Sequence, residues 1–475
     1  MARTRDRKGL AGEIDIWRSV WPGLLHPGEP PGIGNSLRAN FVYSLAGNAV
    51  FAACQWGILT VLVKWGASEV VGRFVFASAL VTPFFSFFNL QLRQVQASDA
   101  SGRFSFLNYL RSRFMTTAFS LALILVLVLA RSFPGRGAII LLFGLTKASE
   151  SVSDIYYGLF QRHMRVDKIG ISLAARGLTS LVALALAFYL THSLIWGLAA
   201  ILVSWVASLF ICDVRNGRAI SGQVGWRDSG RLSIFGERAS PERSIIRLGL
   251  PLGLVMIMIA LETSIPRIVM DFQRGESELG IFAALLYPAV LGAIVITAVS
   301  DASLPQLAKD YASGSREHFG HVVRHAVLVA LGLGLAGLVL TRVLGQWLLR
   351  VLYTPEYAKH AGTFVWVMAA SGITYAATVL GAAATAMQRF KIQTVIHGLN
   401  VMFLVASSLV LIGAFGMRGG AYAMLASASF LAVSYGLVVW SGSRAGKGDT
   451  AGTAISSGGR PSVGSAGPSY AKTPR

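Results

Sequence analysis

The chain has 475 residues, of which 54% are hydrophobic and only 13% are charged. Soluble globular proteins carry about 25% charged residues, so this composition argues against a soluble enzyme, and its hydrophobicity excludes a disordered chain. The formal net charge is +20, but the basic residues lie between long apolar runs and at both ends. That distribution is typical of cytoplasmic loops in a membrane protein, not of a nucleic-acid-binding surface.

Two polar segments flank an apolar core. Residues 1–35 predict a disordered cytoplasmic arm, and residues 441–475, rich in Gly, Ser and Pro, predict a disordered cytoplasmic tail. Between them lie twelve runs long enough to cross a bilayer. They fall at about 39–63, 70–92, 112–131, 137–158, 169–190, 193–212, 245–269, 279–300, 322–343, 361–386, 392–415 and 418–440. Because lipid offers the backbone no hydrogen-bonding partner, we predict an all-α integral membrane fold of twelve transmembrane helices.

The distribution of Lys and Arg predicts that both ends of the chain are cytoplasmic. With that orientation, 30 of the 42 Lys and Arg residues lie in inside segments, nine in outside loops and three within spans, as the positive-inside rule requires. The longest internal connection, 213–244, is predicted to be a cytoplasmic linker. It separates an N-terminal six-helix lobe, 36–212, from a C-terminal six-helix lobe, 245–440.

Similar residues in the two halves indicate an internal repeat. The segment Ser68–Gly72 begins the second span, and the similar segment Ser277–Gly280 begins the eighth. Arg38, before the first span, lies 209 residues ahead of Arg247, before the seventh. An even number of helices per half gives both halves the same orientation, with a substrate path between two pseudo-symmetric lobes.

The fourth span carries three charged residues, Lys147, Glu150 and Asp154, within an arc of roughly 60° on one helix face. A charge at the bilayer centre costs about 2.5–3.5 kcal/mol on insertion scales. Two interpretations follow: an internally neutralised contact in which Lys147 pairs with Glu150, or a hydrated stripe that faces a substrate or an ion.

Other polar residues lie within the first and fifth spans. Asn48 and Gln55 share one side of the first span, where amides bond either sugar hydroxyls or a neighbouring helix. Arg176 has no acidic neighbour on its own helix. It therefore contacts either an anionic ligand such as a phosphate or a carboxylate on another helix, Asp154 or Glu150.

The seventh span contains one carboxylate at depth, Glu262, between Pro251 and Pro266. It is either an ion-coupling site or a hydrogen-bonded core acid. Near the outer end of this span, Arg267 and Asp271 are four residues apart and predict a surface ion pair.

The sequence contains no nucleotide-binding loop and no nucleophile motif, and we predict no catalytic residue, no metal site, no cofactor and no enzymatic activity. Instead, the core 36–440 resembles the polysaccharide-transporter branch of the multidrug/oligosaccharidyl-lipid/polysaccharide (MOP) exporter superfamily, the O-antigen and exopolysaccharide repeat-unit flippases. The resemblance rests on Gly47-Asn48 and Gln55-Trp56, on Asn89-Leu90-Gln91-Leu92-Arg93, on the stretch 147–176 with Glu150-Ser151, Asp154-Ile155-Tyr156-Tyr157-Gly158 and Arg176-Gly177, and on Leu352-Tyr353 with Glu356-Tyr357-Ala358.

This resemblance implies a flippase of the bacterial inner membrane for capsule, exopolysaccharide or lipopolysaccharide synthesis. Its substrate would be an oligosaccharide on undecaprenyl pyrophosphate, moved by alternating access and driven by H+ or Na+. Membrane lipid would surround it, and a polysaccharide polymerase and chain-length proteins are expected partners. Nucleic acid is not an expected partner.

Site residues follow from the residue types. Substrate-binding candidates are Arg38, Asn48, Gln55, Arg93, Lys147 and Arg176, and ion-coupling candidates are Glu150, Asp154 and Glu262. Arg38 and Arg93 have the alternative role of positive-inside anchors.

Two other functions stay open. One is a drug or organic-cation antiporter of the same superfamily, whose pocket is expected to be acidic. The other is a membrane-bound polysaccharide polymerase or ligase, which usually needs a large outer loop with reactive groups.

Overall fold

The computed structural model describes residues 37–99, 102–130, 133, 135–224 and 241–444. Every regular element in this part of the chain is a helix, which confirms the predicted all-α membrane fold. The predicted arm at 1–35 lies outside the described residues, and so does the predicted tail beyond residue 444.

The helices follow one another with short connections. They are α2 (Leu37–Trp65), α3 (Ser68–Phe88), α4 (Leu92–Ser98), α5 (Phe106–Leu129), α6 (Gly137–Arg162), α7 (Val166–Thr191), α8 (Leu194–Ser208), the π-helix η2 (Leu209–Val214), α9 (Arg215–Val224), α10 (Pro241–Ala312), α11 (Arg316–Leu352), α12 (Pro355–Ala358), α13 (Ala361–Ala386), α14 (Phe390–Phe415) and α15 (Met417–Arg444). Because α8, η2 and α9 are continuous, the linker predicted from residue 213 is helical as far as Val224.

Ten of the helices in the described ranges are long and apolar enough to cross a membrane. Helix α10 accounts for two of the predicted spans, since 72 residues would extend about 108 Å, far more than the roughly 30 Å of a bilayer core. It folds back at Gly275, where φ is 86° and only glycine adopts the conformation without strain. Helix α6 has the length of a span but carries the charged stripe, which lowers its hydropathy.

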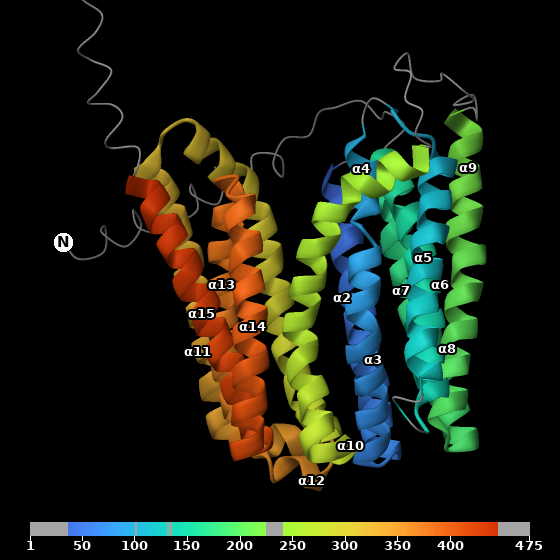
Figure 1. The fold of residues 1–475 in the computed structure, drawn as a ribbon, viewed down its shortest axis with the longest axis vertical. Coiled ribbons are helices and arrows are strands. Elements are labelled where there is room, and N and C mark those ends of the chain that lie inside the picture. Colours follow the sequence, from blue (N-terminus) through green and yellow to red (C-terminus); the bar gives the residue numbers. More distant parts are fainter. Residues whose placement is uncertain (1–36, 100–101, 131–132, 134, 225–240, 445–475) are drawn as a thin grey trace, which may run out of the picture.

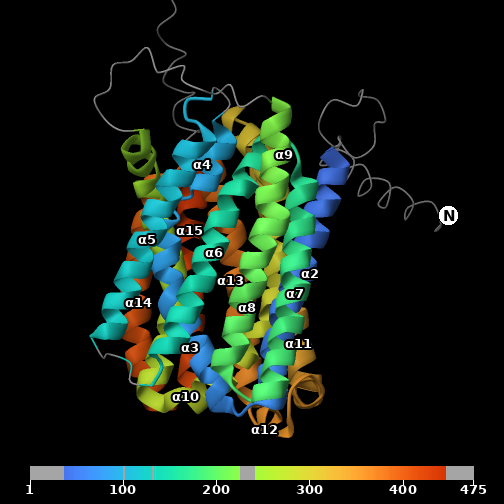
Figure 2. The ribbon, with the colours of Figure 1, turned by 90° about the vertical axis from the view of Figure 1, so that its right-hand side faces the viewer.

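The helices form two bundles (Figures 1 and 2). The first bundle contains α2 to α9, and the second contains α10 to α15. Within the second bundle, α10 lies next to the first: it contacts α3 on one side and α13, α14 and α15 on the other. In Figure 1 the bundles approach each other at the end where α12 lies, here the α12 end, and diverge toward the end where α4 lies, the α4 end.

The two repeat segments meet each other at the α12 end. The hydroxyls of Ser68 and Ser277 are hydrogen-bonded at 2.6 Å. A Cβ at Gly72 would overlap the backbone of Glu276, and a Cβ at Gly280 would overlap the backbone of Ser68. The glycines therefore permit two helix backbones to pack in direct contact.

An ion cluster joins the bundles beside this contact. The Arg136 guanidinium lies 2.5 Å from Asp271 and 2.7 Å from Glu276, and Arg73 lies 2.7 Å from the same Glu276. The predicted surface pair of Arg267 with Asp271 is therefore wrong. The side chain of Asp271 is only 3% exposed and points at the other bundle, because the turn at Gly275 brings it over the start of α6.

Candidate functional site

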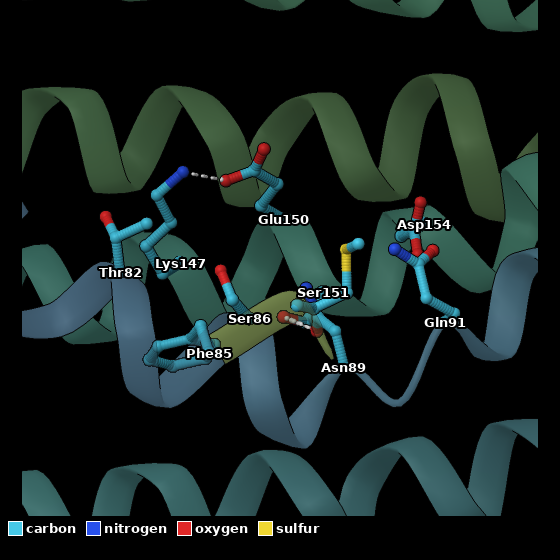
Figure 3. A pocket seen from close by; sticks show the side chains of 10 residues that line it. Thr82, Phe85, Ser86, Asn89, Gln91, Lys147, Glu150, Ser151 and Asp154 are labelled. Carbon is cyan, nitrogen blue, oxygen red and sulfur yellow. Dashed lines mark hydrogen bonds and ion pairs between the residues drawn. The ribbon is translucent and has the colours of Figure 1, made fainter. Parts of the chain in front are cut away.

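A polar cavity of about 230 Å³ lies among the helices of the first bundle, where α3 faces α6 (Figure 3). It is lined by Thr82, Phe85, Ser86, Asn89, Gln91, Lys147, Glu150, Ser151, Asp154 and Met256. All but Met256, which comes from α10, belong to the first bundle. The charged stripe predicted on the fourth span is thus a cavity wall.

Lys147 and Glu150 form an ion pair inside this wall, with the ammonium 2.6 Å from the carboxylate. Their side chains are 27% and 36% exposed, so the pair is not sealed into the packing. Figure 3 shows both side chains on the same side of α6, with Asp154 farther along the helix beside Gln91. The structure therefore combines the two sequence interpretations: the pair forms, and it also borders an open space.

Arg113 is a cation of this site that sequence reasoning missed. Its side chain is fully buried, and its guanidinium donates to the backbone and side-chain oxygens of Asn89 and to Asp154 at 3.2 Å. Asn89 also accepts a hydrogen bond from Ser151 on α6. The count of Lys and Arg residues by location assigned Arg113 to a cytoplasmic loop, because it lies at the edge of the predicted span 112–131.

Arg93 closes the same network from the α4 end. One guanidinium nitrogen lies 3.5 Å from Asp154, another donates to Gln161, and the group lies over the Tyr157 ring. The network thus contains three cations, Lys147, Arg93 and Arg113, against two carboxylates, Glu150 and Asp154. The network as a whole therefore carries one net positive charge, which favours an anion nearby, and Lys147 is the cation of this network that lines the cavity itself.

Arg176 lies outside this network. Its side chain is 1% exposed and pairs at 3.0 Å with Asp213, which is fully buried, and with Ser153. The ring of Trp205 lies against the guanidinium. The carboxylate partner is therefore neither Asp154 nor Glu150. Sequence reasoning assigned Asp213 to the linker, whereas the π-helix η2 turns it into the bundle.

The candidates on α2 do not line the cavity. Asn48 is exposed and donates to the carbonyl of Ser44 one turn earlier. Gln55 has a buried side-chain nitrogen without a hydrogen-bond partner. Arg38 lies in the first turn of α2, and its side chain lies outside the described part. Their roles in substrate binding stay predictions.

Glu262 lies in a second polar cluster, between α10, α14 and α15. One carboxylate oxygen is 2.8 Å from His397 Nδ1 and 2.8 Å from the Asn400 amide nitrogen. The Tyr435 hydroxyl lies 2.8 Å from the other imidazole nitrogen of His397. Sequence reasoning found the carboxylate but none of the other three residues of the cluster, since they lie 135 or more residues away along the chain.

Comparison with known proteins shows which fold this chain has. No protein-family model matches the chain. A curated relative, the capsular polysaccharide biosynthesis protein CapF of Staphylococcus aureus, is 25% identical over 403 residues, covering 83% of this chain and 97% of the relative. A multidrug resistance MATE family transporter of the MOP superfamily in its inward-facing conformation superposes with a TM-score of 0.63 at 13% identity, over 91% of this chain and 98% of that structure. The chain has the MOP transporter fold.

A second superposition supports the same assignment. A MOP superfamily transporter from Pyrococcus furiosus, described as having a binding pocket of reverse polarity, gives a TM-score of 0.58 at 14% identity over 86% of this chain and 95% of that one. The resemblance found in the sequence is thereby confirmed, and the CapF relative agrees with its polysaccharide branch. The chain is a multi-pass membrane protein with a transporter fold.

Proposed function

We propose that this MOP-fold protein is a flippase that moves oligosaccharide repeat units, linked to undecaprenyl pyrophosphate, across the bacterial inner membrane for the synthesis of a surface polysaccharide. The observation that carries the proposal is the polar cavity of the first bundle, which Lys147 lines and whose surrounding network carries one net positive charge. The similarity to a capsular polysaccharide biosynthesis protein supports it.

The physical problem of this reaction lies in the head group. A pyrophosphate with its sugars cannot leave water for hydrocarbon without a large desolvation cost, whereas the polyprenyl tail is already soluble in the bilayer. A polar cavity at membrane depth lowers the barrier for the head alone. Lys147 and Arg93 would attract the pyrophosphate, while Asn89 and Ser86 offer hydrogen-bonding groups that suit sugar hydroxyls.

The carboxylates supply the coupling in this proposal. An arriving anion competes with Glu150 for the Lys147 ammonium and with Asp154 for the Arg93 guanidinium. Binding of the pyrophosphate to these cations weakens their hold on the carboxylates, which then take up H+ or Na+ more readily. Substrate and cation therefore affect each other's affinity at this site.

The orientation follows from the charges of the loops. We propose that the α4 end faces the cytoplasm and the α12 end faces outward, with both chain ends inside. In this orientation the contact at the α12 end closes the outer side of the described state, as expected of a state that receives substrate from the inner leaflet. In agreement, the TM-score is 0.63 against an inward-facing MATE transporter and 0.58 against an outward-facing one. A polysaccharide polymerase and chain-length proteins would receive the product outside.

The test is a flipping assay in proteoliposomes loaded with a fluorescent undecaprenyl-pyrophosphate oligosaccharide. A membrane-impermeant enzyme that modifies the sugar reports the fraction in the outer leaflet. We expect wild-type protein to accelerate flipping and the double variant Lys147→Met/Glu150→Met to reduce the rate at least about tenfold, because the head group loses a charge-assisted hydrogen bond.

Lys309→Met is the matched control, since Lys309 is exposed on α10 outside the cavity; its rate should equal that of wild type. Retained flipping in the double variant would contradict the assigned cavity. Absence of flipping by wild-type protein, together with pH-driven uptake of cationic dyes, would instead establish a drug antiporter.

A further inference from the structure

The Glu262 cluster of the second bundle joins two titratable groups directly. Glu262 and His397 share a hydrogen bond of 2.8 Å, and their side chains are only 14% and 13% exposed. Glu262 lies 13 residues before Gly275, which is about 20 Å along α10 and thus deep in the membrane. A carboxylate paired with an imidazole offers a place at which a proton can be bound within the membrane.

No other charged group in the described ranges pairs with Glu262. Helix α13 contains no Asp, Glu, Lys, Arg or His, and α3 carries charge only at Glu69 and Arg73, near the α12 end. On α10, Arg267 is five residues away and points about 140° around the helix. On α14 and α15, Lys391, Arg418 and Arg444 lie near helix ends. Tyr422 packs against Trp366 and Phe415, and Tyr435 contacts the imidazole.

The donors around Glu262 favour a proton over a metal cation. Ser427 donates to the side-chain oxygen of Asn400, which turns the amide nitrogen of Asn400 toward Glu262. The carboxylate oxygen therefore faces two nitrogen groups, from Asn400 and His397. Sodium would need several oxygen ligands in these positions, whereas a proton needs only a basic lone pair, which His397 offers on the nitrogen next to Tyr435.

Both imidazole nitrogens have partners suited to the charged form. With one N–H directed at the carboxylate, the second nitrogen accepts from the Tyr435 hydroxyl when neutral and donates to that hydroxyl oxygen when protonated. Loading a proton converts a buried cluster of charge −1 into a neutral imidazolium–carboxylate pair, which is far less costly at membrane depth. The described arrangement of α10, α14 and α15 therefore binds a proton better than one in which these helices separate.

The same helix that carries Glu262 also closes the α12 end. After Pro266, which removes one hydrogen bond from the helix ladder and permits a pivot, α10 reaches Asp271 and Glu276 of the ion cluster and then Ser277 and Gly280. We propose that Glu262 and His397 form a proton-binding site whose loading favours closure of the α12 end. This inference deepens the proposed function and rests on it for the use of the proton as coupling ion.

Spin labels at the α12 end test the inference without any substrate. The spin labels are attached to two introduced cysteines, Trp65→Cys on α2 and Lys359→Cys after α12, at positions that are both exposed. The two native cysteines are removed by Cys54→Ala and Cys212→Ser. Pulsed electron resonance in nanodiscs gives the ratio of closed to open distances at pH 8 and pH 5.5. We expect acidification to raise this ratio by about threefold or more, because a loaded site favours the closed state.

Glu262→Gln and His397→Gln should each abolish the pH response. The control is His318→Gln, the same change at a histidine whose side chain is 61% exposed at the start of α11; it should keep the response. A wild-type ratio that does not change with pH would overturn the inference. So would a response that persists in both variants, since Asp271 and Glu276 would then be the titrating groups, or a ratio moved by sodium at constant pH. A pH response without flipping of the lipid-linked sugar would leave this inference standing and reject the proposed function alone.

Discussion

The two bundles differ in how they hold charge within the membrane. In the first bundle, three cations and two carboxylates form a network beside a cavity of about 230 Å³, and the Lys147–Glu150 pair at the cavity wall is roughly one-third exposed. In the second bundle, the side chains of Glu262 and His397 are hydrogen-bonded to each other, and each is about one-seventh exposed. A cluster with open space and spare positive charge suits a bulky anion. A closed carboxylate–imidazole contact suits a proton.

Removing Arg113, the fully buried cation, should disturb the network of the first bundle most. Arg113→Met leaves Asp154 with Arg93 as its one charged partner and removes one donor from each of two Asn89 oxygens. We expect a loss of about 3 kcal/mol of stability and a strongly reduced yield of folded protein. Thermal unfolding in detergent measures it. The double variant Arg113→Met/Asp154→Leu should recover most of the loss, and failure of that rescue would show that the ion pair is not the cause.

The contact through which the bundles communicate offers the next test. Gly72→Val places a side chain against the backbone of Glu276, so the α12 end can no longer close. We expect the closed population, measured with labels at positions 65 and 359, to fall by more than about tenfold. Gly436→Val is the matched control, because a Cβ there meets nothing within 4 Å. An unchanged closed population in the Gly72 variant would mean that the helices reach this state by another packing.

The smallest expected effect concerns the Glu262 cluster. Tyr435→Phe removes one hydrogen bond to His397 while the carboxylate contact remains. We expect a loss of about 1 kcal/mol of stability, visible as a lowered unfolding temperature. The pH response of the α12 end should persist, since Glu262 and His397 still share the proton site. Abolition of that response would assign Tyr435 an essential part in the proton path.

Particular residues show how far sequence reasoning reaches. The stripe on the fourth span was predictable because Lys147, Glu150 and Asp154 are three or four residues apart, and helix periodicity alone places them on one face. Arg113 and Asp213 were not, because each lies at the edge of an apolar run, where a charge looks like a loop residue. Asp271 was predicted to pair locally with Arg267, yet its partner, Arg136, lies 135 residues away.

The sequence by itself determined that the chain enters a membrane as helices, since a long apolar run and the need to satisfy its backbone within lipid are local properties. It also indicated the repeat, whose two segments turned out to pack against each other at Ser68 and Ser277. Only the tertiary structure decided which charge meets which: Arg176 with Asp213, Arg113 with Asp154, Glu262 with His397. Such pairings depend on how each helix is rotated and where it crosses its neighbours, and those angles are set by contacts between residues far apart in the chain.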